Sequence, residues 1–366
     1  MRPLEGIRVI DLSRLLPGPM CSWYLCGLGA EVVKVESPGG GDYLRHSPPR
    51  TPSGEGAWFA ALHAGKKSVV LDLKQSSHCT ALRALLGSAD VLIEGNRPGT
   101  MARLGLSPQA LRVEFPRLVI ASITGFGQDG PLRDRPGHDL GFQALAGTLS
   151  LGRPVDGVPP VPAVPVGDIG GGALTAAMRI CAALHARGKT GEGAWIDASM
   201  TEGTLAMIAP QVAGMSAMGR NPVPGGELLT GANPRYRSYR CRDGRFLAVA
   251  ALEDKFWATL CDRIGRAVEP DESALEQLFL ENGRDEWASM LGPACCEPVL
   301  QLDELATHPL HVSRRSLTAL PDGLRVSHPV PDGHTSACRP SPALGEHTES
   351  ELARVGFDPS RLKERK

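Results

Sequence analysis

The chain has 366 residues, a hydrophobic fraction of 42% and a formal net charge of -1 at pH 7. This length is enough for a sizeable core and more than one domain, and the near-neutral charge argues against a nucleic-acid partner. We find no signal peptide and no apolar run near the roughly 18 residues of a membrane span. The 9 cysteines lack the paired spacing of a zinc site, so we expect reduced thiols in the cytoplasm and no metal.

The first part of the chain alternates strand patterns with helical patterns. Strand-like runs lie at residues 7–13, 31–37, 66–74, 90–96 and 118–127, and helical runs at 20–30 and 82–89. This alternation predicts an α/β domain with a mainly parallel, Rossmann-like sheet, covered by helices on both faces because its strands are mostly apolar. The loop after the first strand lacks the G-x-G-x-x-G fingerprint, which argues against a dinucleotide-dependent oxidoreductase.

The rest of the chain predicts a second, smaller domain. Residues 137–185 favour two helices joined by a proline-rich bridge, and residues 193–200 favour another strand. Further on, Asp243-Gly244 is a turn signal between two strand patterns. We place the large domain at residues 1–200, completed by about 325–366, and a small α+β domain at 225–310. Linkers are expected at about 200–225 and 310–325.

Three titratable residues stand at predicted helix starts. His138 taken alone is most simply a surface or hydrogen-bonded residue, and Asp139 and Asp168 are natural N-caps. Asp168 is followed by three glycines, each of which costs a helix about 1 kcal/mol relative to alanine. Such a run allows close approach of a ligand, for which free N–H groups at the helix start suit an oxyanion or phosphate, or of a neighbouring backbone. Both interpretations stay open.

Four cations lie near the ends of predicted strands: Lys34, Lys74, Arg97 and Arg103. In open α/β sheets, ligands bind beyond the carboxyl ends of the strands. A cluster of cations there fits an anionic ligand such as a phosphorylated cofactor. Four solvated surface cations are the simpler alternative.

Seven stretches, taken together, resemble the class III CoA-transferases (CaiB/BaiF type) and, within them, the alpha-methylacyl-CoA racemases. They lie in order at residues 4–38, 68–74, 90–106, 123–131, 137–150, 167–200 and 345–349. The resemblance implies an interlocked homodimer in which the active site lies between the large domain of one chain and the small domain of the other. Coenzyme A then enters as part of an acyl-CoA thioester substrate, with no separate cofactor, no metal and no membrane.

The resemblance also implies roles for particular residues. Transferases of this family use one aspartate, matching Asp168, as a nucleophile. Racemases use it as a base and add a histidine in a G-H-D motif, matching His138, and a small-domain glutamate, matching Glu253. The positions that it implies for CoA contact are Lys34, Leu71, Asp72, Leu73, Lys74, Gly95, Asn96, Arg97, Arg103, Gly137 and Asp139.

Because all three racemase positions are filled, we expect an acyl-CoA racemase or epimerase. It would move the α-proton of a 2-methylacyl-CoA thioester through an enolate, with His138 and Asp168 as opposed bases and Glu253 orienting the imidazole. Backbone N–H groups at the helix starts after His138 or Asp168 are candidate donors to the enolate oxygen. A CoA-transferase with an acyl or CoA adduct on Asp168, and a non-catalytic acyl-CoA-binding homologue, are the alternatives.

Two departures from the racemase pattern bear on the substrate. Racemases commonly carry an arginine that contacts a CoA phosphate where this chain has Ser37, and Lys34 and Arg45 are the candidates to replace it. The region at residues 271–292 is a compressed version of a longer helical region in relatives. We therefore expect a reshaped acyl pocket.

Overall fold

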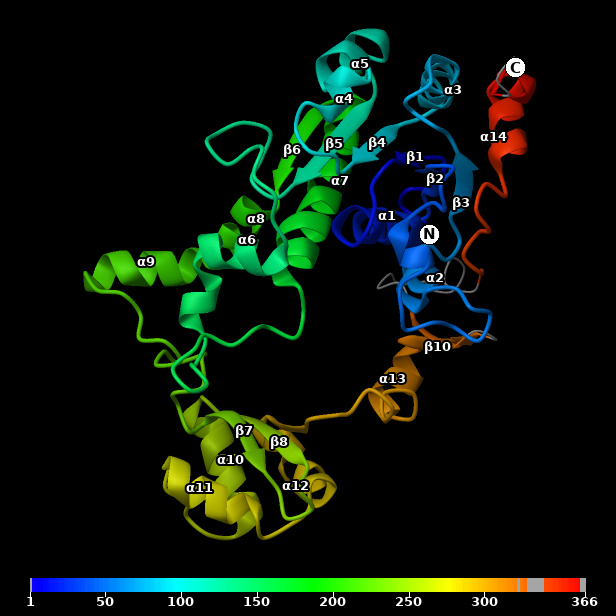
Figure 1. Ribbon diagram of the computed structural model, residues 1–366. Helices are drawn as coiled ribbons and strands as arrows, with labels where there is room; N and C mark the ends of the chain where they lie inside the picture. The colour runs from blue at the N-terminus through cyan, green and yellow to red at the C-terminus, as the bar shows by residue number, and fades with distance from the viewer. Residues whose placement is uncertain (1, 321–322, 328–338, 363–366) are drawn as a thin grey trace. The chain divides into compact units, whose positions relative to one another are not determined.

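A computed structural model describes residues 2–320, 323–327 and 339–362 (Figure 1). The chain divides into two compact units. The first unit comprises Met1–Ala146, Pro162–Met207 and Pro309–Lys366, and the second comprises Gly147–Val161 and Ile208–His308. Residues 147–161, which the sequence analysis assigned to the large domain, therefore belong to the second unit.

A six-stranded parallel sheet forms the centre of the first unit, in the order β3-β2-β1-β4-β5-β6. The expectation of a mainly parallel α/β sheet is thus confirmed. The strand order runs outward in both directions from the neighbouring pair β1 and β4, which is the topological switch point of such a sheet. The strands are β1 (Arg8–Asp11), β2 (Glu31–Glu36), β3 (Lys67–Val70), β4 (Val91–Glu94), β5 (Val119–Thr124) and β6 (Trp195–Ser199).

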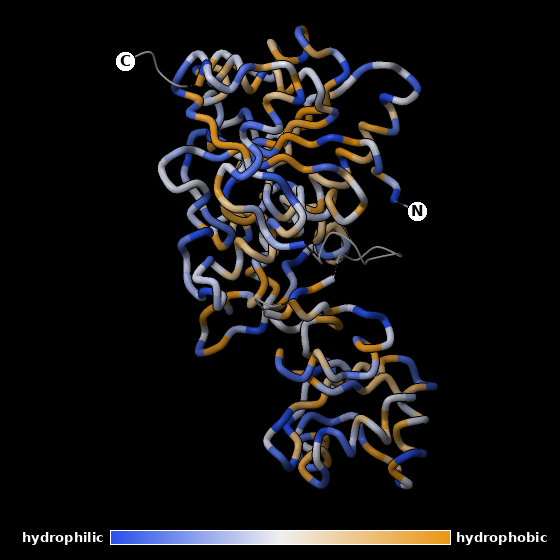
Figure 2. The backbone as a smooth tube through the Cα atoms, turned by 90° about the vertical axis from the view of Figure 1, so that its right-hand side faces the viewer, coloured by the Kyte–Doolittle hydropathy of each residue, from blue (hydrophilic) through white to orange (hydrophobic). Residues whose placement is uncertain are grey.

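Helices cover both faces of this sheet because alternate strand residues point to opposite faces. Val9 and its register partners Val32 and Val91 face α1 (Pro17–Gly27) and α7 (Thr175–Thr190). The intervening residues, such as Ile10, face a second layer that contains α3 (Ser76–Leu86), α4 (Thr100–Arg103), α5 (Pro108–Glu114) and α14 (Thr348–Arg354). Figure 2 shows the backbone coloured by hydropathy, with hydrophobic (orange) stretches alternating with hydrophilic (blue) ones along the chain.

The remaining elements of the first unit are short. They are η1 (Tyr43–Arg45), α2 (Ala57–Leu62), α6 (Asp139–Ala146), the π-helical η3 (Gly167–Leu174), α8 (Met200–Met207), α13 (Pro309–Arg314), the hairpin β10 (Leu317–Leu320) and β11 (Gly323–Val326), and η5 (Pro359–Leu362).

The C-terminal helix α14 is tied to the sheet by buried charges. Glu351 is only 3% exposed and pairs with Arg8 of β1 at 2.7 Å and with Lys67 of β3 at 2.6 Å. Glu31 of β2 pairs with the same two cations, so α14 belongs to a network of charges that joins it to three strands of the sheet.

The helical segment Gly167–Thr190 differs from one sequence expectation. By length and composition alone this 24-residue segment is apolar enough to cross a membrane, whereas the sequence analysis found no such run. Ala173, Ala176 and Ile180 of this segment are fully buried in the core of the first unit, as in a core helix of a globular domain.

The second unit is a small α+β fold. The antiparallel strands β7 (Tyr236–Arg240), β8 (Phe246–Ala250) and β9 (Cys296–Pro298) form its sheet. The expected hairpin turn is confirmed, with Gly244 at φ +80°, a conformation that favours glycine. Its helices are η2 (Thr148–Leu151), α9 (Ala209–Met218), α10 (Asp254–Ile264), α11 (Glu272–Phe279), α12 (Arg284–Leu291) and η4 (Gly292–Ala294).

Candidate active site at the carboxyl edge of the sheet

A cavity of about 410 Å³ opens in the first unit where β1, β4 and β5 end. It therefore lies at the topological switch point, where α/β sheets of this kind bind ligands. Its walls come from the loops that follow the three strands and from the segment before α6. The residues that line it include Ser13, Arg14, Leu15, Gly95, Asn96, Arg97, Phe126, Arg133, Arg135, Gly137, His138, Phe142 and Asp168.

Asp168 enters this cavity from the first turn of η3. The sequence analysis took it for an N-cap, but it lies inside the π-helical turn, which begins at Gly167. Wide turns of this kind often occur at functional sites. Burial and, to a smaller extent, the nearby Asp139 raise the pKa of Asp168 and His138 lowers it, so that the pKa rises from 3.8 to about 6. The carboxyl group is therefore a stronger base than an ordinary aspartate.

His138 is an exposed residue that lines the same cavity immediately before α6. Its carbonyl oxygen accepts the N–H groups of Gly141 at 2.8 Å and Phe142 at 3.3 Å, so His138 begins the helical hydrogen bonding. Asp139, the expected N-cap, is instead the first residue of α6. The structure thus brings His138 and Asp168, 30 positions apart in the sequence, to one cavity.

The Asp139 carboxylate orders the start of a different helix. One oxygen accepts the backbone N–H of Asp168 at 2.9 Å, and the other accepts Nε2 of Gln143 at 2.6 Å. Asp139 does not line the cavity. It holds Asp168 by the main chain and, through its own charge, adds to the rise in that residue's pKa.

The glycines after Asp168 serve close packing between helices. A Cβ atom on Gly171 would lie 2.3 Å from the carbonyl oxygen of Met200, and one on Gly170 would lie 2.2 Å from the methyl group of Met207. No side chain larger than hydrogen fits there without movement of α8. Of the two interpretations left open by the sequence, the structure supports the close approach of a neighbouring backbone.

Four arginines make the cavity cationic: Arg14, Arg97, Arg133 and Arg135. Only Arg97 came from the sequence analysis. Arg14 follows β1, and the other two lie in the loop before His138, so only their position beside strand ends and the G-H-D motif could have identified them. Among the described residues that line it, only Asp168 carries a carboxylate, and such a surface suits an anionic substrate.

A second cavity, of about 280 Å³, lies beyond the ends of β1, β2 and β3. Arg14 and Asn96 line both cavities. Several positions expected to contact CoA line the second one: Lys34, Leu71, Asp72, Leu73, Lys74 and Asn96. Gly95, Asn96, Arg97 and Gly137 line the first.

Three expected site residues lie elsewhere. Arg103 lines neither cavity and donates a hydrogen bond to Thr100 Oγ1 at 2.9 Å. Asp139 also lines neither cavity, and its carboxylate accepts the N–H of Asp168. Glu253 is an exposed residue of the second unit, at the position before α10.

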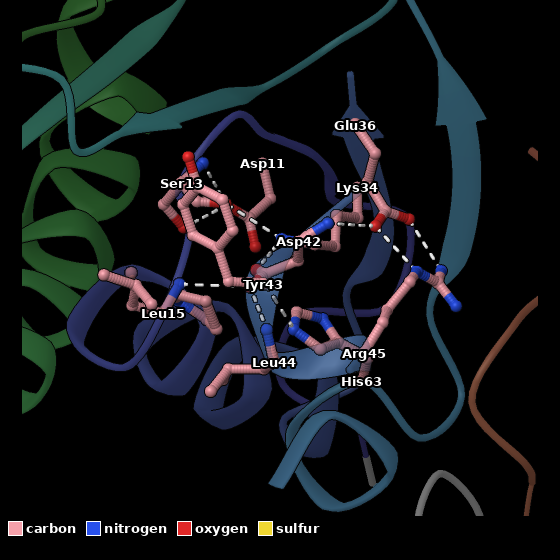
Figure 3. Close-up of polar contacts among 12 residues, drawn as sticks. Asp11, Ser13, Leu15, Lys34, Glu36, Asp42, Tyr43, Leu44, Arg45 and His63 are labelled. Carbon is pink, nitrogen blue, oxygen red and sulfur yellow. Dashed lines mark hydrogen bonds and ion pairs between the residues drawn. The ribbon is translucent and has the colours of Figure 1, made fainter. Parts of the chain in front are cut away.

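The two candidates to replace an arginine at position 37 are both engaged in the protein interior (Figure 3). Arg45 is 7% exposed and binds Glu36 through two nitrogens, at 2.9 and 2.7 Å. Lys34 is fully buried and pairs with Asp42 at 2.9 Å. Ser37 lines the second cavity.

Comparisons with known proteins agree with this arrangement. A family model, CoA-transferase family III, matches residues 4–348. The chain belongs to CoA-transferase family III. Among family members, it is 35% identical to the alpha-methylacyl-CoA racemase of Homo sapiens, over 97% of this chain and 94% of that one. It is 33% identical to the succinate–glutarate CoA-transferase of Agrobacterium fabrum, over 96% of each chain.

A solved structure of this family has the same fold. The crystal structure of a CaiB/BaiF family protein from Brucella suis matches with a TM-score of 0.84 and 28% identity, covering 96% of this chain and 99% of that one. The expected family membership is thus confirmed. Relatives named for isomerase and for transferase chemistry match over nearly the whole chain, so the assignment they share is an enzyme of CoA-transferase family III.

Proposed function

We propose that the protein is an acyl-CoA racemase or epimerase that moves the α-proton of a 2-methylacyl-CoA thioester through an enolate. The observation that carries the proposal is the pairing of His138 and Asp168 at one cavity. Inverting a carbon centre requires a proton to leave one face and another to arrive at the opposite face. Two titratable groups on one cavity supply that pair, and such acid–base help contributes roughly 10²–10⁴ in rate.

Asp168 is suited to the role of base. Burial, reinforced by Asp139, raises the pKa of Asp168 to about 6, so the group is ionised at neutral pH yet binds a proton more strongly than an ordinary carboxylate does. A catalytic base is most effective when its pKa lies near the working pH. His138 would deliver or accept the second proton.

The enolate oxygen needs preorganised hydrogen-bond donors. The N–H of Asp168 already donates to Asp139, which removes one candidate at the start of η3. The N–H groups of Asp139 and Leu140 lie in the first turn of α6, where no intrahelical acceptor is available. We assign the enolate oxygen to the start of α6.

The cations at the rim fit the phosphate groups of a CoA ester. Arginine binds phosphate through paired N–H donors, and Arg14 and Arg97 line the cavity that holds His138 and Asp168. Lys74 is an exposed residue of the second cavity. We therefore assign the second cavity to the nucleotide end of the substrate and the first to its thioester.

We also propose a homodimer in which the partner's Glu253 orients His138. Support comes from apolar side chains of the second unit that are left in solvent, among them Val155 and Val158, each 64% exposed, and Val161, 72% exposed. Apolar surface of this kind marks an interaction site. A monomer at micromolar concentration by light scattering would contradict this part of the proposal.

A CoA-transferase is the second candidate, because Asp168 is also where the nucleophile of that chemistry would stand and transferase relatives match closely. In that reaction the Asp168 carboxylate attacks the thioester carbonyl carbon and displaces the CoA thiolate, giving a mixed anhydride. The position of His138 and Asp168 on a cavity argues against a non-catalytic homologue.

The deciding experiment is incubation with a 2-methylacyl-CoA in deuterated water. We expect deuterium at the α-carbon, loss of exchange in Asp168→Asn, and a face-selective defect in His138→Ala. Asp129→Asn, which changes an exposed carboxylate, should exchange normally. An acyl- or CoA-derived mass increment mapped to Asp168, without exchange, would reverse the ranking in favour of the transferase.

A further inference from the structure

The loop Ser13–Leu15 is shared by the two cavities. All three residues line the first cavity, and Arg14 also lines the second. Arg14 is the cation that this loop presents, and its guanidinium lies over the Tyr43 ring, 5.4 Å from the centroid. The position of this loop therefore decides where the two parts of a bound thioester meet.

The Ser13–Leu15 loop contains a backbone conformation that is unfavourable unless other contacts stabilise it. Leu15 has φ +65°, and a residue with a side chain pays roughly 1–3 kcal/mol for such a conformation unless its surroundings fix it. Leu15 is also 43% exposed, so packing of its own side chain contributes little. The constraint must come from contacts to the backbone.

Buried charges provide those contacts (Figure 3). The Lys34 ammonium donates to the carbonyl oxygen of Ser13 at 2.8 Å and pairs with Asp42 Oδ2 at 2.9 Å. The other oxygen of Asp42 accepts the N–H of Leu15 at 3.4 Å. From the sheet side, Asp11 accepts the N–H of Ser13 at 2.9 Å. The Lys34–Asp42 ion pair thus holds the loop at both of its ends, through the carbonyl oxygen of Ser13 and the N–H of Leu15.

Lys34 lines the second cavity, but its ammonium is engaged by the Ser13 carbonyl oxygen and by Asp42. Its side chain and that of Asp42 are both 0% exposed. It stands in β2, and its ammonium lies between the carbonyl oxygen of Ser13 and the carboxylate of Asp42. A lysine that bound a phosphate group would instead present its ammonium to the cavity.

We propose that Lys34 is a positioning residue: its buried ion pair with Asp42 fixes the Ser13–Leu15 loop between the two cavities, and it makes no contact with the substrate's phosphate groups. This inference rests on the proposed function, because it takes a CoA ester to be the ligand of both cavities. It replaces the sequence expectation of a direct phosphate contact.

The test is calorimetric binding of CoA itself to the full chain over a series of salt concentrations. Direct phosphate contacts weaken with salt because exposed charges are screened. Lys34→Met should weaken CoA binding about tenfold at every salt concentration, leaving the salt dependence as in the wild type. The matched variant Lys74→Met removes an exposed lysine of the second cavity and should make the salt dependence shallower.

A second variant separates positioning from folding. Lys34→Met leaves Asp42 as an unpaired buried charge, which destabilises the fold. Lys34→Met with Asp42→Asn removes both charges and keeps an oxygen for the N–H of Leu15, so its thermal midpoint should return toward the wild-type value while CoA binding stays weak. Wild-type affinity in the folded double variant, or a shallower salt dependence in Lys34→Met, would overturn the inference. Failure of the wild type to bind CoA would instead refute the proposed function.

Discussion

Replacing Asp168 with asparagine should stabilise the protein while it removes activity. Burial and the neighbouring Asp139 raise the pKa of Asp168 from 3.8 to about 6, so the folded state disfavours the ionised carboxylate that neutral pH imposes. A difference in pKa of this size between the folded and unfolded states corresponds to about 3 kcal/mol in the free energy of unfolding. Because solvent reaches part of the carboxyl group, we expect Asp168→Asn to raise the free energy of unfolding by about 1–3 kcal/mol at pH 8.

The pH dependence of this gain follows from the direction of the shift. Above pH 6 the carboxyl is ionised in both the folded and unfolded states, and its full cost to the fold is present. As pH falls from 6 towards 4 the folded protein takes up the proton first, so the cost disappears. The advantage of Asp168→Asn should be about half as large at pH 5 and mostly lost at pH 4.

The assay is urea unfolding of both proteins at pH 8, 5 and 4, followed by circular dichroism. Asp129→Asn is the matched control, because it makes the same chemical change at an exposed site. A variant that is no more stable than the wild type at pH 8, or a gain that is equal at pH 8 and pH 4, would refute the reasoning about burial.

Three further predictions address the site and its support. The rate of α-proton exchange should fall below an apparent pKa near 6, and Asp139→Asn, which removes a neighbouring negative charge, should move this limb to lower pH in a pH–rate profile. Gly171→Ala should cost about 1–3 kcal/mol in denaturant unfolding because its Cβ would meet α8, whereas Gly141→Ala, with nothing within 4 Å, should be neutral or stabilising. Burial, with nearby Lys66, Lys34 and Arg45, lowers the pKa of His63 well below its usual value, so the free energy of unfolding should decrease as pH falls below about 6.5. His63→Phe should make this decrease smaller. An unchanged dependence of stability on pH in the variant would contradict the prediction.

The parts of the fold that depend on local pattern could be predicted from the sequence. The apolar runs that form β1 to β6 predict a buried parallel sheet, and Asp243-Gly244 predicts the hairpin of the second unit. His138 and Asp168 were found through motif resemblance, and the structure places both on one cavity. They share a cavity because the start of η3 contacts the start of α6, where Asp139 accepts the N–H of Asp168, and residue spacing alone does not reveal this contact.

Features that depend on distant partners could not be predicted. A lysine near a strand end resembles an exposed cation, but Lys34 is interior because Asp42 and the Ser13 carbonyl meet its ammonium. Asp139 resembled the cap of its own helix, whereas its carboxylate accepts from Asp168, 29 residues away. Arg133 and Arg135 lie in a loop without periodicity, so no pattern assigned them to the cavity.

The ion pairs of α14 also constrain how the chain can be made. Arg8 leaves the ribosome well before its partner Glu351, which lies 343 positions further along the chain. The segment at residues 208–308, which belongs to the second unit, is synthesised in between. Arg8 and Lys67 of the central sheet therefore gain this acidic partner only after α14 has been synthesised. A chain that stops before α14 would lack Glu351, and Arg8 and Lys67 would then share Glu31 as their carboxylate partner.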